Sequence, residues 1–351
     1  MIPSRIFLEI FDKRHHSGRS AIAIVFLGLA LSLTAALGAC GIKTAIKTAE
    51  KDRPLRFLYV PGVDDPFYTT LESGIRAKAA ELGVDILVSS YPPVWTPDEQ
   101  LSALEASIDE KGIDALLISP VAADILVEPL RSVRERGIEV ITVDTFIGNG
   151  DYSSPSNYSF PLTYVGSDNE LGGRLMADHL AELVGEKGKV FCQASNPDAS
   201  SIAGRVKGFK EGIARYPNIE LVGIEWCLDD EDVAERQTRD MLRRHPDLVG
   251  IFGVNVFSAQ GSYRAILETG LTGAVKVASW DATATLIGAL ERGEVDLVLA
   301  QKPAEMGSLA VEWTARHFRE GVTVPKKVIP GFEFFTRDNV NESAMRQFIY
   351  Q

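Results

Sequence analysis

The sequence predicts an α/β protein built from two doubly wound parallel-sheet domains. From Leu55 onward, apolar runs of strand length alternate with amphipathic stretches of helix length, which is typical of parallel sheets covered on both faces. This pattern occurs twice, with matching motifs at matching places. The length of 351 residues also favours two domains, because single cores seldom grow beyond roughly 250–300 residues.

The expected strands fall into two series of five. The first series is Leu55–Val60, Asp85–Ser89, Ala115–Ser119, Glu139–Val143 and Tyr164–Val165. The second series is Lys189–Gln193, Ile219–Trp226, Leu248–Gly253, Lys276–Ser279 and Val295–Ala300. The helices expected between them are Thr69–Leu82, Pro97–Lys111, Leu126–Arg136, Leu171–Gly185, Ala203–Tyr216, Asp232–Arg244 and Ala259–Thr269.

Matching residues in the two series indicate a duplicated domain. Gly74 lies inside the first helix of one half, as Gly208 lies inside the first helix of the other. Asp144 follows the fourth strand of the first half, and Asp281 follows the fourth strand of the second. Because ligands bind at the carboxyl ends of strands in open parallel sheets, we expect the strand-end loops of both domains to face one cleft.

The first 39 residues are expected to be an export signal. A positively charged start leads into Ala21–Leu37, an uncharged segment whose length suits a signal peptide better than a membrane span. Leu37-Gly38-Ala39-Cys40 resembles the lipobox of bacterial lipoproteins, in which the cysteine is lipidated. A plain cleaved signal and an uncleaved anchor are the alternatives. Residues 40–53 are expected to be a tether.

Composition excludes several classes of function. The formal net charge of -12 argues against a nucleic-acid partner, which would require a basic face. The histidines do not cluster outside the signal, so neither a metal nor another cofactor is expected. The chain also lacks the nucleophile-elbow, phosphate-loop and zinc-protease motifs, and we expect no enzymatic activity.

Polar and aromatic side chains gather in the expected strand-end loops. They are Asp65, Phe67, Tyr68, Asp144, Arg205, Asn255, Asp281 and Gln301, with Trp226 and Trp95 as further candidates. Carboxylates, a guanidinium and amides can satisfy sugar hydroxyls, which both donate and accept hydrogen bonds. Aromatic faces can cover the C–H surface of a sugar ring. The sequence therefore favours a small sugar or polyol as the ligand.

Each of these residues also has a structural alternative. Asp64 or Asp65 could simply cap the helix that begins at Pro66. The aromatic residues could belong to the core, Arg205 could lie on a helix surface, and Asn255 could form a turn. Cys192 and Cys227 fall on strands expected to be neighbours, where they could form a disulfide in an exported protein or remain buried thiols.

In this order and spacing, these residues resemble the periplasmic sugar-binding proteins of the ribose/galactose/allose type. The motifs that carry the resemblance are Asp65-Pro66-Phe67-Tyr68, Val140-Ile141-Thr142-Val143-Asp144 and the run from Gly166 to Gly173, followed by Arg205, Asn255, Asp281 and Gln301. The resemblance covers about residues 54–340. It implies the type I periplasmic binding protein fold. The ligand contacts that it implies are Asp65, Phe67, Tyr68, Asp144, Arg205, Asn255, Asp281 and Gln301. Trp226 is the nearest match to a third aromatic contact of that family.

The resemblance also implies a three-segment hinge near Ser167, Gln301–Lys302 and Pro330. One lobe would comprise residues 54–167 and 302–329, including a helix around Met306–Glu320, and the other residues 168–301 and 330–351. Ribose binders usually carry Asn where Asp65 stands and Arg where Thr145 stands, so the identity of the sugar is left open.

The implied protein is an exported, extracytoplasmic monomer, attached to the membrane only through a lipid anchor. It would close around its ligand and deliver it to the membrane permease of a bacterial ABC transporter. A ligand-sensing component of a chemoreceptor or sensor-kinase system is the alternative.

Overall fold

The computed structural model describes residues 53–110 and 112–350. The expected signal peptide at 1–39, the lipidation site at Cys40 and the tether as far as residue 52 lie outside the described residues. The described chain contains two six-stranded sheets. None of its helices combines the length and the apolar character needed to cross a membrane.

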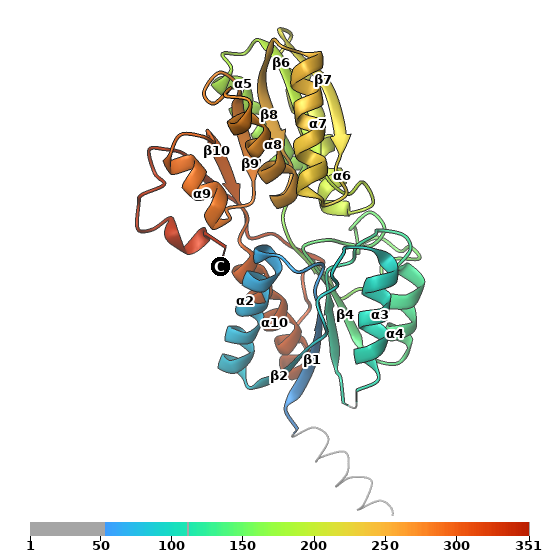
Figure 1. Ribbon diagram of the computed structural model, residues 1–351. Coiled ribbons are helices and arrows are strands. Elements are labelled where there is room, and N and C mark those ends of the chain that lie inside the picture. The colour runs from blue at the N-terminus through green and yellow to red at the C-terminus, as the bar shows by residue number, and fades with distance from the viewer. Residues whose placement is uncertain (1–52, 111, 351) are drawn as a thin grey trace, which may run out of the picture. The chain divides into compact units, whose positions relative to one another are not determined.

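The first sheet has the strand order β11-β5-β4-β3-β1-β2, and its neighbouring strands are parallel. Its strands are β1 (Leu55–Val60), β2 (Val84–Val88), β3 (Ala115–Ile118), β4 (Glu139–Val143), β5 (Thr163–Val165) and β11 (Lys327–Val328). Its helices are α2 (Pro66–Leu82), α3 (Pro97–Ile108), α4 (Val127–Glu135) and α10 (Pro303–Glu320). In Figure 1, α2 and α10 lie side by side on one face, and α3 and α4 cover the other.

The second sheet has the order β12-β10-β9-β8-β6-β7, in which only β12 runs antiparallel to its neighbour. Its strands are β6 (Gly188–Ala194), β7 (Ile219–Trp226), β8 (Leu248–Gly253), β9 (Lys276–Trp280), β10 (Leu297–Ala300) and β12 (Glu333–Phe335). Its helices are α5 (Asn169–Leu183), α6 (Ser200–Ile213), α7 (Glu231–Arg244), α8 (Val256–Glu268) and α9 (Ala284–Glu291). Helix α5 packs on α6, and α7 packs on α8.

The two sheets repeat one strand order, with β1 to β5 corresponding to β6 to β10. The predicted α/β fold with two parallel-sheet domains is therefore present. The chain passes from one sheet to the other three times, between β5 and α5, between β10 and α10, and between β11 and β12. Each lobe is thus assembled from segments that are far apart in the sequence.

The ten expected strands are all present, and their ends differ from the expected ones by no more than two residues. Several helices begin up to three residues earlier than expected, because each starts directly after its capping residue rather than at its first periodic apolar residue. Helix α9 and strands β11 and β12 were not expected. They are short, and only four of the eight residues of α9 are buried.

Paired glycines let two helices touch in each lobe. A Cβ on Gly208 of α6 would collide with the backbone carbonyl of Glu170 in α5, and one on Gly74 of α2 would collide with that of Ala304 in α10. The repeat motif around Gly74 and Gly208 therefore marks the same backbone contact in both lobes.

Gly208→Ala is expected to lower the free energy of unfolding by about 1–3 kcal/mol, because the added methyl group must separate two closely packed helices. Urea denaturation measures this loss. Gly288→Ala in α9 is the matched control, since its Cβ would approach only the movable Arg292 guanidinium, at 3.2 Å. Equal stability of the Gly208 variant and the native protein would contradict the proposed contact.

Candidate functional site

A cavity lies between the two lobes at the carboxyl ends of their strands. It contains about 350 Å³ of space not filled by atoms, part of which is open to solvent. Nine of the ten expected ligand-binding side chains line it, namely Asp65, Phe67, Tyr68, Trp95, Asp144, Arg205, Asn255, Asp281 and Gln301. Asp144, Arg205 and Asp281 thus share one hollow, although they come from three separate segments of the chain.

Asp144 and Asp281 occupy equivalent places in the two lobes. Each follows the fourth strand of its repeat, and each has a left-handed backbone, with φ of 65° and 76°. Their backbone N–H groups donate to Val165 O and Leu299 O, both at 2.8 Å, on the strand that follows. Asp adopts this conformation more readily than most residues, so the repeated turn aims both carboxylates into the cavity.

The first lobe contributes mainly hydrogen-bond acceptors. Asp65 caps α2 by accepting a bond from Tyr68 N at 2.9 Å, and it also lines the cavity. The Tyr68 hydroxyl donates to Asp144 Oδ2 at 3.0 Å. Asp144 Oδ1 is buried and has no hydrogen-bond partner within residues 53–110 and 112–350. A buried carboxylate oxygen without a donor costs free energy, and a ligand hydroxyl would relieve that cost.

Aromatic rings form the apolar wall of the first lobe. Phe67 and Tyr68 meet edge to face with ring centroids 5.1 Å apart, and Tyr68 meets Trp95 in the same way at 6.0 Å. The Trp95 indole Nε1 is buried and unpaired among the described residues. This wall can therefore cover a C–H surface and still offer one N–H donor.

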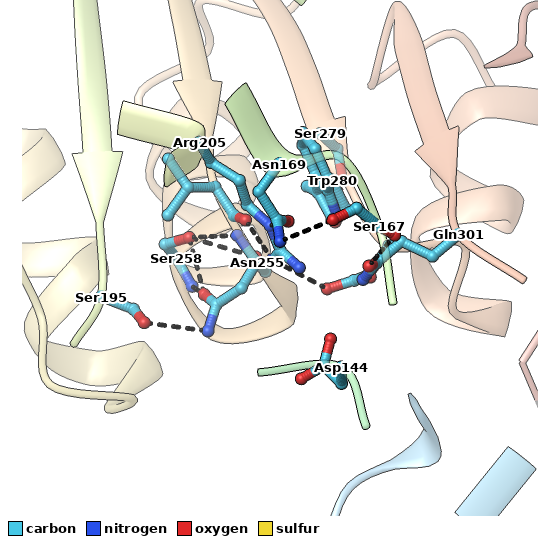
Figure 2. A network of polar contacts seen from close by, with 12 residues as sticks. Asp144, Ser167, Asn169, Ser195, Arg205, Asn255, Ser258, Ser279, Trp280 and Gln301 are labelled. Atoms are coloured by element: carbon cyan, nitrogen blue, oxygen red, sulfur yellow. Dashed lines mark hydrogen bonds and ion pairs between the residues drawn. The ribbon is translucent and has the colours of Figure 1, made fainter. Parts of the chain in front are cut away.

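Arg205 is the cation of the second lobe. Its Nε donates to Asn169 Oδ1 and its Nη1 to Val254 O, both at 2.9 Å. The guanidinium lies over the Trp280 ring, 4.3 Å from the centroid, with Nη1 4.0 Å from Asp281 Oδ2. These contacts hold it in a fixed position at 3% exposure, and Figure 2 shows it within this network.

Asn255 lies at the start of α8, where its side chain is engaged by the protein. Its Oδ1 accepts bonds from Ser258, and its Nδ2 donates to Ser195 Oγ at 3.0 Å and to Asp229 Oδ1 at 2.8 Å. Both amide hydrogens are thus in use, and Asn255 acts chiefly by capping α8 and holding Asp229. Asp229 also lines the cavity and was missed from the sequence.

Gln301 connects the cavity with the first crossing between the lobes. Its Oε1 accepts a bond from Ser167 Oγ at 2.7 Å, and its Nε2 donates to Asp281 Oδ1 at 2.8 Å. Figure 2 shows Ser167 and Gln301 beside the Arg205 network, with Asp144 facing them. Two of the three crossings are therefore bonded to each other next to the cavity.

Four carboxylates and a single guanidinium surround the cavity. Burial raises the pKa of Asp144 to about 6, against the opposing effects of Arg205 and of the Tyr68 hydroxyl. Burial also raises the pKa of Asp281, while Arg205 is the largest influence holding it down. The pKa values of Asp65 and Asp229 are likewise raised by burial. The cavity is therefore acidic in character.

Residues 57–321 match a family model described as a periplasmic binding protein domain. The chain belongs to the periplasmic binding protein family. The resemblance inferred from the site motifs is thereby confirmed, and so is the two-lobed fold.

Named relatives of this periplasmic binding protein are sugar-binding proteins of import systems. The ribose import binding protein of Haemophilus influenzae is 27% identical over 296 residues, which make up 84% of this chain and 96% of the relative. A solute-binding protein of an ABC transporter from Agrobacterium vitis, solved with α-D-tagatopyranose, is 37% identical, with a TM-score of 0.82. That match covers 85% of this chain and 99% of the other.

A further solved structure shows the same likeness. The solute-binding protein of an ABC transporter from Burkholderia graminis, in complex with D-arabinose, is 25% identical with a TM-score of 0.75, and the match covers 82% and 97% of the two chains. These relatives bind substrates for transport and are not enzymes, which agrees with the expectation that this chain catalyses nothing. Because its relatives are periplasmic binding proteins, an extracytoplasmic location is implied for this protein.

Some expectations about this periplasmic binding protein need correction. Trp226 does not line the cavity, because it ends the edge strand β7 and the chain turns inward only afterwards, at Asp229. The side chain that caps α2 is that of Asp65 rather than Asp64. Cys192 and Cys227 are both buried free thiols, so the possible disulfide is absent. No cluster of metal-ligating side chains occurs in the described part of the chain.

Proposed function

We propose that this protein captures a neutral sugar or polyol in the cavity between its lobes and delivers it to the permease of an ABC transporter. The observation that carries the proposal is a pair of unpartnered polar atoms, Asp144 Oδ1 and Trp95 Nε1, on residues that line a cavity together with Arg205 and Asp281 of the other lobe. The named relatives that carry ribose, tagatose or arabinose support the choice of ligand class.

The two walls suit opposite sides of one sugar ring. Asp65 and Asp144 on the first lobe accept hydrogen bonds. Arg205 on the second lobe uses Nε and Nη1 for its bonds to Asn169 and Val254, and its Nη2 would donate to a ligand. Each bond to a charged group contributes roughly 1.5–3 kcal/mol. A few of them, less the cost of ordering the ligand, are enough for micromolar affinity at about -8 kcal/mol.

Binding is proposed to close the two lobes around the three crossings. A ligand that contacts both walls stabilises the closed form over the open one, since only the closed form offers all the contacts. Phe146 N of the first lobe donates to Ser200 Oγ of the second at 2.9 Å, which adds a direct contact between the lobes. The lobes would comprise residues 54–167 with 302–329, and residues 168–301 with 330–351.

A thermal-shift series with D-tagatose, D-ribose and D-arabinose tests the function. A ligand at 100 times its dissociation constant is expected to add about 2.7 kcal/mol of stability. The absence of any response to these sugars and to a panel of hexoses and polyols would count against sugar capture.

The acidic cavity is expected to reject anionic sugars. D-Ribose 5-phosphate and D-ribonate should bind at least about 100-fold more weakly than D-ribose, because like charges brought together in a desolvated site cost several kcal/mol. Isothermal titration calorimetry at pH 7 measures the difference. Comparable affinity for the phosphate would show that the four carboxylates do not govern selection.

Export and membrane attachment are proposed from the N-terminal sequence and the periplasmic relatives. Cys40 would be lipidated and become the new N-terminus, which leaves a monomeric protein tethered to the outer face of the membrane. Labelling of growing cells with a fatty acid should mark the native protein and not its Cys40→Ala variant. Labelling of both would exclude Cys40 as the modified residue.

A further inference from the structure

The end of the chain folds back onto the wall of the cavity. After β12, the chain forms a short 3-10 turn at Arg346–Phe348, and Tyr350 N then donates to Ala282 O at 2.9 Å. A bridge between Thr283 and Tyr350 fixes this strand-like contact beside Asp281. The Tyr350 side chain is 3% exposed although it lies one residue from the chain end.

The Tyr350 hydroxyl is bonded to two residues that line the cavity. It donates to Asp281 Oδ1 at 3.1 Å, and it accepts a bond from the backbone N–H of Gln301 at 2.8 Å. Gln301 Nε2 donates to the same Asp281 oxygen. The hydroxyl therefore ties the orientation of the Asp281 carboxylate to the backbone of the second crossing between the lobes.

The Tyr350 ring also touches the opposite lobe. It meets Phe67 edge to face, with ring centroids 5.8 Å apart and an interplanar angle of 72°. Behind it lies a second cavity, whose lining includes Thr70, Lys302 and the chain end from Gln347 to Tyr350. Gln301 lines both cavities and is bonded to Tyr350. Tyr350 therefore lies beside the protein wall that separates the two cavities.

We infer that Tyr350 is a positioning residue for ligand capture, which fixes Asp281 for the ligand and closes against Phe67 when the lobes meet. Tyr350 itself does not line the ligand cavity, and its effect on binding passes through Asp281, Gln301 and Phe67. The inference rests on the proposed function, because it assigns a role in binding at the same cavity. It makes the chain end part of the binding machinery.

Two physical consequences follow from this arrangement. Without the hydroxyl, Asp281 would lose a donor that fixes its rotamer and stabilises its ionised form. The free energy of ligand binding would then be reduced by the cost of ordering the carboxylate. Loss of the hydrogen bond would also raise the pKa of Asp281, because the Tyr350 hydroxyl is one of the groups that hold it down, together with Arg205 and Gln301.

The test compares Tyr350→Phe with Tyr263→Phe. Tyr263 donates to Glu294 Oε2 at 2.6 Å and lies outside both cavities, so its variant removes an equivalent hydroxyl–carboxylate bond elsewhere in the same lobe. Calorimetry with D-tagatose, D-ribose and D-arabinose is expected to show about tenfold weaker binding for Tyr350→Phe, because part of the binding free energy must then order the Asp281 carboxylate. Tyr263→Phe should bind like the native protein.

The pH profile separates positioning from a merely structural role. Asp281 must be ionised to accept ligand hydroxyls, so a raised pKa in Tyr350→Phe moves the acid loss of affinity to higher pH. Tyr263→Phe should leave the profile unchanged. Affinity within twofold of the native value together with an unshifted profile would overturn the inference.

A measurement without ligand keeps the two proposals distinguishable. Carboxyl carbon NMR, with the Asp281 signal assigned through Asp281→Asn, is expected to show a higher titration midpoint in Tyr350→Phe than in the native protein. If the native protein bound no sugar, both the proposed function and the positioning role of Tyr350 would be wrong. The titration of Asp281 would still report on the Tyr350–Asp281 contact. An unchanged midpoint would remove the contact on which the inference depends.

Discussion

Arg205→Ala is expected to abolish sugar binding and to lower the free energy of unfolding by about 3 kcal/mol at pH 7. The guanidinium contacts Asn169, Val254 and the Trp280 ring, and it faces the buried Asp281 carboxylate. Removing one member of a buried charge pair leaves the other without compensation. The variant therefore loses the cation of the binding site and part of the packing of its lobe, which urea unfolding and calorimetry measure separately.

The loss of stability should depend on pH in a definite direction. Burial raises the pKa of Asp281 in the folded protein and Arg205 holds it down, so removal of Arg205 raises it further. A carboxyl group with a raised folded-state pKa destabilises the protein above that pKa, and the penalty disappears as protons bind. The electrostatic part of the deficit is therefore largest above the folded-state pKa of Asp281 and shrinks as the pH falls below it.

Two variants serve as controls for Arg205→Ala. Lys207→Ala removes an exposed positive charge from the same helix, where it pairs with Glu170, and it should change neither binding nor stability appreciably. Adding Asp281→Asn to Arg205→Ala should recover part of the lost stability, because no uncompensated carboxylate remains. A double variant less stable than Arg205→Ala would refute the electrostatic explanation.

The repeat in the sequence explains why most of the site could be predicted. Asp144 and Asp281 recur after the same strand of each half, and a parallel sheet brings such positions to one edge. The structure adds what the pattern does not contain, namely the left-handed turn at both residues and the bond from each to the following strand. Periodicity locates a residue on an element, but it does not identify hydrogen-bond partners.

Asp229 and Trp226 show where prediction from the sequence failed. The large aromatic residue at the end of β7 was the more conspicuous candidate, yet β7 is an edge strand and Trp226 remains outside the cavity. Two residues with positive φ, Leu228 and Asp229, then turn the chain inward. A non-glycine residue in that conformation leaves no clear mark in a single sequence, so the carboxylate was missed.

Tyr350 was missed for a different physical reason. Its contacts depend on the chain end returning to β9 and β10, and no apolar periodicity precedes it. Asn255 is the converse case. The sequence identified its place at the cavity, but not that its oxygen would cap α8 and that Ser195 and Asp229 would take both its amide hydrogens. In both cases the role depends on long-range partners, which local sequence patterns do not specify.

Affinity for a neutral sugar is expected to fall about tenfold between pH 7 and pH 5, because Asp144 has a pKa of about 6 in the ligand-free protein. A ligand hydroxyl that donates to Oδ1 favours the ionised form, so binding is full above this pKa and weakens as the pH falls below it. Calorimetry with D-ribose or D-tagatose at several pH values measures it.

Asp144→Asn isolates the contribution of the Asp144 charge to binding. Asn also tolerates the left-handed backbone at φ 65°, so the turn should keep its conformation. The variant is expected to bind about tenfold more weakly at pH 7, because it replaces a bond to a charged acceptor by a weaker neutral one, and its affinity should vary less between pH 7 and pH 5. Asp151→Asn, an exposed change in the loop after β4, is the control and should match the native protein at each pH. A native affinity that is flat across this range would mean that the protonation of Asp144 does not govern capture.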